Sequence, residues 1–304
     1  MLRTVFIGSR NDFDDMLVHW LSQRTELVGA VWLDASLWQR NWSSRMAFFQ
    51  QRLRRRGVLK TLDEAAYFLV FRAFLGAKTA EQLYTLSDPY FASNGNARWD
   101  GDAIVAENVN APEVLDFLTE REPDLAFAMC INNYFGKKLR SIPKHGVLLW
   151  HEGITPEYRG LHSPFWALHN LDFDEVGYTL LRMNDQLDAG EIFAQGRIAE
   201  LDPRRDTPSY LGHKAIAESL PAVERFLREL EAGTATPIDR SGAESHYYSY
   251  PGLSDLVRFR LRLQRWQRRE SRAGAPSAIG GNGAEAHVGS SSADERVSRP
   301  AATD

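Results

Sequence analysis

Four short apolar runs constrain the fold of this chain most strongly. They cover residues 3–8 (RTVFIG), 26–34 (ELVGAVWLD), 124–132 (DLAFAMCIN) and 146–151 (GVLLWH). Runs with so little polar alternation are typical of strands that are covered on both faces of a sheet. Between the first two runs, apolar residues recur at helical spacing over 12–24. A strand, a helix and a strand in close succession predict a parallel βαβ unit, so we expect an α/β fold with a doubly wound, mostly parallel sheet.

One catalytic domain is expected over residues 1–240, with a helical insertion at 36–87. The insertion is rich in aromatic residues and contains the basic run RLRRRG. Its simplest interpretation is a helical pair that buries its aromatics against the domain. The alternative is an amphipathic hairpin that binds a membrane surface or a partner.

The region after residue 240 has a different composition. We expect a loop and an Arg-rich helix over 241–272, in which the amphipathic part at 253–272 contains seven arginines. The helix has either a solvated basic face or a surface for an anionic membrane or an RNA backbone. Residues 273–304 contain almost no large apolar side chains, so a disordered tail is expected there.

Composition excludes several classes of protein. The net charge of -4 gives no overall basic excess of the kind that nucleic-acid binders carry. The single cysteine, Cys130, cannot form an internal disulfide, and neither a signal peptide nor a spanning helix is evident, so we expect a cytoplasmic protein. The histidines at 145, 162 and 169 lack metal-ligand spacing, and no metal is predicted.

An imidazole and a carboxylate are the main candidates for chemistry. His151 ends the fourth apolar run, and Asp188 lies in the turn NDQLDAGEI between two further predicted strands. Asn132 ends the neighbouring run and Asn133 follows it. The carboxyl ends of adjacent parallel strands meet at the ligand-binding edge of open α/β sheets. A positioned histidine with a carboxylate suits proton transfer.

These motifs resemble the formyltransferase family that uses 10-formyltetrahydrofolate. The family pattern is Asn-x-His, a Pro five residues after the His, an Arg-Gly pair and then Leu-Asp-x-Gly. The chain has His151, Pro156, Arg159-Gly160 and 187–190 (LDAG), but Leu149 stands where the family has Asn. The similarity covers roughly residues 1–35 and 100–240.

The resemblance implies a reaction in which an amine attacks the formyl carbon, and the resulting tetrahedral oxyanion collapses to release tetrahydrofolate. It implies proton transfer by His151, which Asp188 orients, with no metal. The folate is then expected along 130–136 and the turn that contains Asp188. The implied folate contacts are Tyr134, Pro156, Leu187, Ala189 and Gly190, and the implied acceptor contacts are Glu152, Arg159 and Gly160.

The Leu149 departure removes a carboxamide donor, and the loss of one such donor typically costs about 10²–10³ in rate. Asn132 or Asn133 could supply a donor from the neighbouring strand end. The acceptor that we expect is a small-molecule amine, such as an amino sugar. Methionyl-tRNA is the less favoured alternative, because the tRNA enzyme normally adds a C-terminal β-barrel, in whose place only the Arg-rich helix is expected here. A noncatalytic folate-binding or interaction protein is the third hypothesis.

Overall fold

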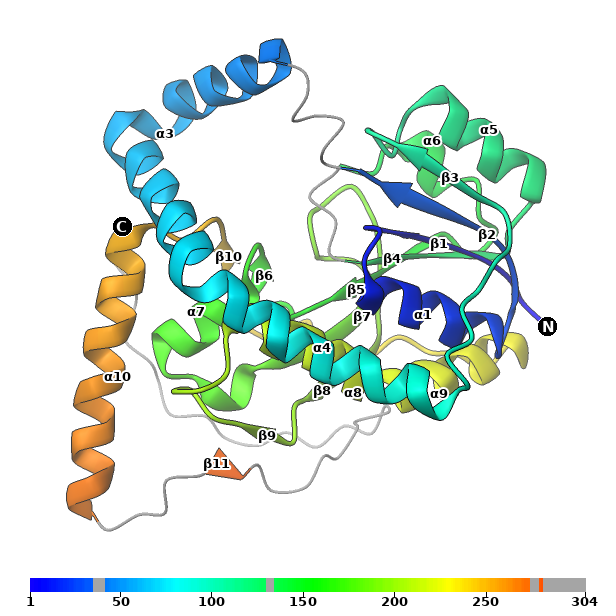
Figure 1. Ribbon diagram of the computed structural model, residues 1–304. Helices are drawn as coiled ribbons and strands as arrows, with labels where there is room; N and C mark the ends of the chain where they lie inside the picture. Colours follow the sequence, from blue (N-terminus) through cyan, green and yellow to red (C-terminus); the bar gives the residue numbers. More distant parts are fainter. Residues whose placement is uncertain (35–41, 130–133, 274–278, 281–304) are drawn as a thin grey trace.

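The computed structural model describes residues 1–34, 42–129, 134–273 and 279–280. Its centre is a seven-stranded sheet with the order β3-β2-β1-β4-β5-β7-β8 (Figure 1). The strands are β1 (Arg3–Gly8), β2 (Glu26–Leu33), β3 (Ala103–Ala106), β4 (Leu125–Met129), β5 (Val147–His151), β7 (Gly177–Arg182) and β8 (Ile192–Arg197).

The first five strands of the chain pair in parallel, and β7 and β8 are antiparallel to their neighbours. In the pairing of β4 with β5, Met129 is opposite Trp150. The carboxyl ends of these two central strands therefore lie side by side, as the apolar runs predict. The expected α/β fold with a mostly parallel sheet is confirmed.

Helices cover both faces of the sheet (Figure 1). Alternate residues of β1 show the division, because Phe6 belongs to one core cluster while Val5 and Ile7 belong to the other. One face is covered by α1 (Asp12–Ser22), α7 (Ser163–Asn170), α8 (Pro208–Glu218) and α9 (Leu220–Glu231), with the short η2 (Phe173–Glu175) after α7. The other is covered by α5 (Pro112–Arg121) and α6 (Lys137–Arg140).

The insertion is helical, with α3 (Trp42–Val70), a π-helical turn η1 (Phe71–Leu75) and α4 (Gly76–Ser93). Its helices run beyond the predicted limit at residue 87, and its predicted start at 36 lies outside the described residues. Gly57 interrupts α3 with a φ of 75°, a backbone conformation that costs glycine least. Beyond that kink Tyr67 packs edge-on against Phe165 of α7, so the insertion shares the core of the sheet domain.

The C-terminal helix α10 (Leu253–Ala273) lies along an outer edge of the molecule (Figure 1). It packs against α7 through Phe259, which contacts Phe165. Two small sheets accompany it, in which β6 (Arg159–Gly160) pairs with β10 (Tyr247–Tyr248) and β9 (Glu200–Leu201) pairs with β11 (Ile279–Gly280). The rest of the predicted tail beyond Ala273 lies outside the described residues.

Two helix ends differ from what the local sequence favours. Asn110 is a residue type that favours the N-cap position, but Ala111 occupies that position in α5. The Asn110 side chain instead donates to the Tyr134 carbonyl and accepts from the Gly136 N–H, so it ties two loops together. Apolar periodicity over 208–230 favours one continuous helix, but the structure has two, α8 and α9, which are separated at Ser219. Pro221 in the first turn of α9 cannot donate the hydrogen bond that a continuous helix needs.

Candidate active site

The candidate site is built on the carboxyl end of β5. His151 is the last residue of that strand, its side chain is buried, and it pairs with Thr179 of β7. Asn132 and Asn133, the predicted donors from the neighbouring strand end, lie outside the described residues, as does Cys130.

The ring of His151 is held through Nε2. This nitrogen lies 3.0 Å from the Tyr158 carbonyl oxygen and 3.2 Å from Ser163 Oγ. A carbonyl oxygen can only accept, so in the neutral ring Nε2 carries the proton and donates it. No described residue bonds to Nδ1, which therefore has a lone pair that can take a proton.

Ser163 can approach His151 because residue 153 is a glycine. A Cβ on Gly153 would lie 2.5 Å from Ser163 Cβ and 2.9 Å from His151 Nε2. Ser163 Oγ also donates to the Tyr158 carbonyl over 2.9 Å. The glycine thus makes room for a serine that contacts the ring and its acceptor together.

A buried polar network holds the loop after His151. Thr179 Oγ1 donates to the Gly153 carbonyl and accepts from the Thr155 N–H. Gln195 of β8 donates to Thr179 Oγ1 and to the Thr155 carbonyl. Arg240 connects Gln195 to the buried carboxylate of Glu157. These bonds fix the backbone that positions both His151 and Tyr158, because buried polar groups are costly unless they are paired.

Asp188 lies in the turn between β7 and β8. Its carboxylate is buried and accepts from the Gly160 N–H over 2.8 Å. Its own φ is 49°, a left-handed conformation that aspartate tolerates better than most residues. Gly190 closes the turn, and a Cβ there would lie only 1.5 Å from the Arg182 carbonyl oxygen. This turn therefore requires glycine at the last position of the LDAG motif.

The Arg-Gly motif holds the same turn. Arg159 donates from Nε and Nη2 to the Leu187 carbonyl and from Nη1 to Ser245. Gly160 has a φ of 95°, and a Cβ there would lie 2.1 Å from the Tyr248 carbonyl oxygen of β10. These contacts favour a structural role for Arg159, and its predicted acceptor contact stays a prediction.

One short segment, residues 158–160, contacts both candidate groups. The Tyr158 carbonyl holds His151 Nε2, and the Gly160 N–H holds the Asp188 carboxylate. The two side chains are far apart in the sequence, yet each bonds to a backbone group of this segment. No hydrogen bond joins His151 to Asp188 among the described contacts.

The other predicted site residues have varied surroundings. Tyr134 and Leu187 are exposed, and Pro156 follows a cis peptide bond. The Ala189 carbonyl accepts from the Asn184 side chain. Glu152 lies against α8, where a Cβ on Gly212 would come within 2.2 Å of its carboxylate. Their proposed contacts with folate or acceptor remain predictions.

Leu149 lies on the same face of β5 as His151, two residues earlier. It packs with Leu181 and Ile192 in a small apolar cluster. The side chain that replaces the family asparagine is therefore accommodated by apolar neighbours on β7 and β8.

Two further features define the electrostatics of the site. His162, next to Ser163, has a left-handed backbone and stacks edge-on against Tyr250, and burial lowers its pKa to about 4. The described residues include no group of three or more His, Cys, Asp or Glu side chains that could hold a metal ion. With a pKa of about 4, the His162 ring is neutral at pH 7.

Sequence reasoning missed Ser163, Gln195 and Arg240. Ser163 lies close to the Arg-Gly motif, and the glycine at 153 was a signal that the chain packs tightly against His151. Gln195 and Arg240 had no such signal, because their roles depend on strand pairing and on the return of the chain after α9.

Comparison with known proteins adds family information. Residues 75–219 match the sequence profile of a family described as Formyl transferase. A methionyl-tRNA formyltransferase from Thermotoga neapolitana is 36% identical over 130 residues, which cover 43% of this chain and 41% of that protein. The match thus spans about two fifths of the length of that relative.

Solved structures give weaker likenesses. A sugar N-formyltransferase from Shewanella has a TM-score of 0.48 and 13% identity, covering 82% of this chain and 77% of that one. A phosphoribosylglycinamide formyltransferase from Anaplasma phagocytophilum has a TM-score of 0.47 and 17% identity, covering 82% and 98%. The profile match includes His151, Ser163 and Asp188. Residues 75–219, which include the site at the carboxyl end of β5, are therefore similar in sequence to formyl transferases.

Proposed function

We propose that this protein is an enzyme that transfers a formyl group from 10-formyltetrahydrofolate to a primary amine of a small molecule. An amino sugar or another biosynthetic intermediate is the acceptor class that we favour, and the cytoplasm is the expected location. The observation that carries the proposal is that residues 158–160 bond to both His151 and Asp188.

The contacts of His151 support a role in proton transfer. Its Nε2–H is engaged by Tyr158 and Ser163, so Nδ1 is the atom that takes the proton from the attacking amine. Asp188 acts through the loop that it holds and through its negative charge close to this segment. The N–H groups of Leu187 and Asp188 bond to no described residue, which supports the proposed contact of this turn with the polar edge of a pteridine.

The proposal is tested with the full chain, folinic acid and a panel of amines. Folinic acid, a stable analogue of the formyl donor, should raise the melting temperature by several degrees at saturating concentration. Tetrahydrofolate should be released from 10-formyltetrahydrofolate only when the correct amine is present. The panel includes free and nucleotide-linked amino sugars and methionyl-tRNA. The proposal fails if folinic acid does not bind and no amine is formylated.

Ser163→Ala is expected to reduce turnover about 2- to 10-fold, the effect of one net hydrogen bond to the reacting ring. Folinic acid binding should not change. The ring proton can be located by two-bond nitrogen–proton NMR on histidine-labelled protein, where the His151 signal should show the proton on Nε2. Ser93→Ala, at the exposed end of α4, is the matched control. A proton found on Nδ1 would contradict the assignment.

Leu149→Asn is expected to destabilise the protein by about 1–3 kcal/mol without raising turnover, because its amide would enter the apolar cluster with Leu181 and Ile192. Leu149→Met, which conserves volume, should cost less than about 1.5 kcal/mol. The stability of both variants is measured by thermal melts, and their turnover is measured with the formyl donor and the amine. Faster turnover in the Asn variant would instead mean that a missing donor limits the rate.

Two observations favour second candidates. The relative from Thermotoga neapolitana is named as a methionyl-tRNA formyltransferase, so methionyl-tRNA is the alternative acceptor. Leu149 favours a noncatalytic folate-binding protein. Folinic acid binding without turnover, unchanged in a His151 variant, would select that candidate over the enzyme.

A further inference from the structure

The outer face of the insertion exposes aliphatic side chains. Leu59 is 86% exposed, and Leu62 and Leu69 are also exposed. Their spacing of three and seven residues places them on one face of α3, and the buried Thr61 and Tyr67 lie on another. An apolar stripe that faces away from the core is not needed to hold the insertion in place.

Helix α10 has a similar division. Phe259 and Leu263 are buried against the domain, while Val257 and Leu261 are exposed. Five arginines on the exposed side form no ion pair or hydrogen bond with any residue that the structure describes. They are Arg260, Arg265, Arg268, Arg269 and Arg272.

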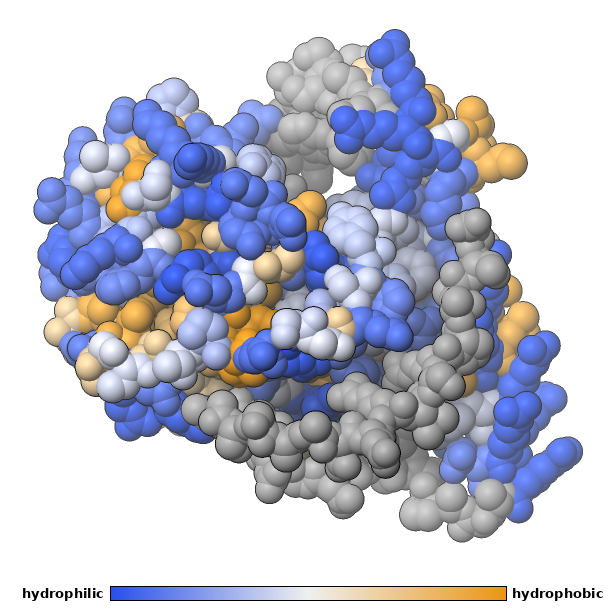
Figure 2. Space-filling view, turned by 180° about the vertical axis from the view of Figure 1, so that it is seen from behind, coloured by the Kyte–Doolittle hydropathy of each residue, from blue (hydrophilic) through white to orange (hydrophobic). Residues whose placement is uncertain are grey.

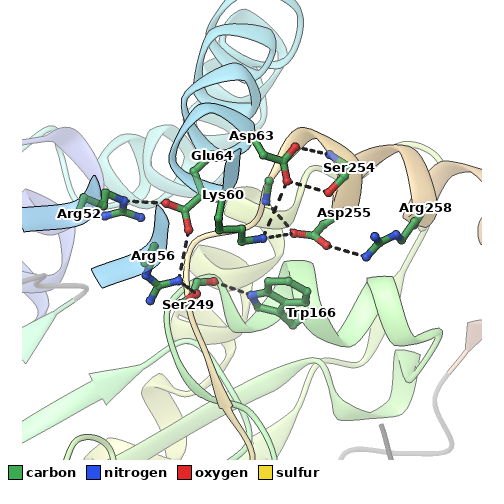
Figure 3. Close-up of polar contacts among 11 residues, drawn as sticks. Arg52, Arg56, Lys60, Asp63, Glu64, Trp166, Ser249, Ser254, Asp255 and Arg258 are labelled. Carbon is green, nitrogen blue, oxygen red and sulfur yellow. Dashed lines mark hydrogen bonds and ion pairs between the residues drawn. The ribbon is translucent and has the colours of Figure 1, made fainter. Parts of the chain in front are cut away.

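The carboxylates of α3 and of the start of α10 are paired with basic or hydroxyl side chains (Figure 3). The buried carboxylate of Glu64 accepts from Arg52 and Arg56. The buried Asp255, near the start of α10, accepts from Lys60 of α3. The negative charges of these two carboxylates are thus neutralised by ion pairs, and the outer face of α10 remains positive.

The same contact fixes α3 beside α10. Asp63 accepts from both the N–H and the hydroxyl of Ser254. A Cβ on Gly252 would lie 1.9 Å from the Asp63 carboxylate, so the approach depends on that glycine. The aliphatic stripe of α3 therefore adjoins the start of α10, whose exposed face continues from Val257 and Leu261 to the arginines.

We propose that this surface binds an anionic lipid bilayer. The α3–α10 surface consists of Leu59, Leu62, Leu69, Val257 and Leu261 together with the five unpaired arginines of α10. Figure 2 shows hydrophobic residues among hydrophilic ones along the right-hand edge, the side on which α10 lies in that view. Exposed aliphatics beside arginines match the interface of an anionic membrane, where side chains insert and cations meet headgroup phosphates. None of the described helices is both long and apolar enough to span a bilayer, so the contact is peripheral.

Charge and composition argue against two other occupants. An RNA backbone would pair with the arginines but would leave Leu59 and Leu62 in water. A second copy in a two-fold interface would bring the unpaired arginines of two α10 helices towards each other. Anionic lipid satisfies both parts of the surface.

The test is sedimentation of the full chain with vesicles of phosphatidylcholine alone or mixed with phosphatidylserine. Binding should require phosphatidylserine and weaken between about 50 and about 500 mM salt. The triple variant Arg265→Gln, Arg268→Gln, Arg272→Gln should bind on the order of 100-fold more weakly. The double variant Leu59→Ser, Leu62→Ser should lose at least about tenfold.

Matched controls alter exposed residues elsewhere. The double variant Arg204→Gln, Arg205→Gln removes two exposed arginines, and Val105→Ser removes an exposed aliphatic side chain from β3. Neither variant should change vesicle binding. Thermal melts verify folding, and neither folate nor amine is present, so the result is independent of the proposed activity. The proposal is overturned if phosphatidylserine vesicles are not bound. Binding of duplex RNA and the oligomeric state are measured for the same variants. The proposal is also overturned if the leucine variant binds vesicles normally while the arginine variant loses binding to both vesicles and duplex RNA. It is overturned as well if the leucines stabilise a dimer that does not bind vesicles.

Discussion

His151→Gln is expected to lose about 10²–10⁴-fold in turnover, the usual contribution of a positioned acid or base. The glutamine can place an amide N–H near the Tyr158 carbonyl, so the loop should keep its position. It has no atom that takes and returns a proton as Nδ1 does. Folinic acid should therefore bind with nearly unchanged affinity while formyl transfer collapses.

The matched control is His145→Gln, which changes a histidine that precedes β5 at the opposite edge of the sheet. It should leave turnover within about twofold, since surface changes away from a site are usually small. Melting curves and folinic acid titrations accompany both variants. If His151→Gln keeps normal turnover, His151 is not the proton-transfer group and the proposed mechanism fails. If it loses folinic acid binding instead, the ring serves the folate site rather than the proton.

The sheet could be predicted from the sequence because burial on both faces leaves a local signature. The runs at 3–8, 26–34 and 146–151 have the continuous apolar character that a covered parallel strand requires. The turn at 187–190 was also visible, since Leu-Asp-Ala-Gly between two apolar strands signals a tight turn. These features depend on neighbours in the sequence.

The contacts that hold the site could not be predicted in this way. The bond from Gly160 to Asp188 joins groups 28 positions apart and depends on how β6 pairs with β10. The loop network depends on Arg240, which returns to the sheet only after α9. Local propensity also failed at Ser219, where Pro221 ends a helix that the apolar periodicity alone would continue. Tertiary pairing decided each of these positions.

Asp14→Asn is expected to stabilise the protein, and to do so more strongly as the pH rises. Asp14 is 3% exposed in α1, and its carboxylate accepts from the Ser9 N–H over 2.7 Å. Burial raises its pKa from 3.8 to about 7, and the neighbouring Asp15 acts in the same direction. An asparagine oxygen can accept the same hydrogen bond without a charge to desolvate.

The stability of the wild type depends on pH because the Asp14 carboxyl has different pKa values in the folded and the unfolded chain. In the unfolded chain the group loses its proton near pH 3.8, whereas the folded chain keeps it until about pH 7. Stability of the wild type should therefore fall as pH rises through that window and level off above it. With a folded-state pKa of about 7, the free energy of unfolding of the wild type should fall by roughly 2–3 kcal/mol between pH 5 and pH 8. The variant lacks this loss, so its advantage over the wild type should grow by about that amount.

Denaturant unfolding at pH 5 and pH 8 measures the effect, with Asp116→Asn, an exposed carboxylate on α5, as the matched control. If the free energies of unfolding of the wild type and Asp14→Asn differ by the same amount at both pH values, Asp14 ionises freely in the folded protein. A variant that is less stable at both would mean that the charged form is needed for the bond to Ser9. The loop between β1 and α1 lies at the carboxyl end of β1, so the result also reports whether that edge of the sheet tolerates a buried negative charge at neutral pH.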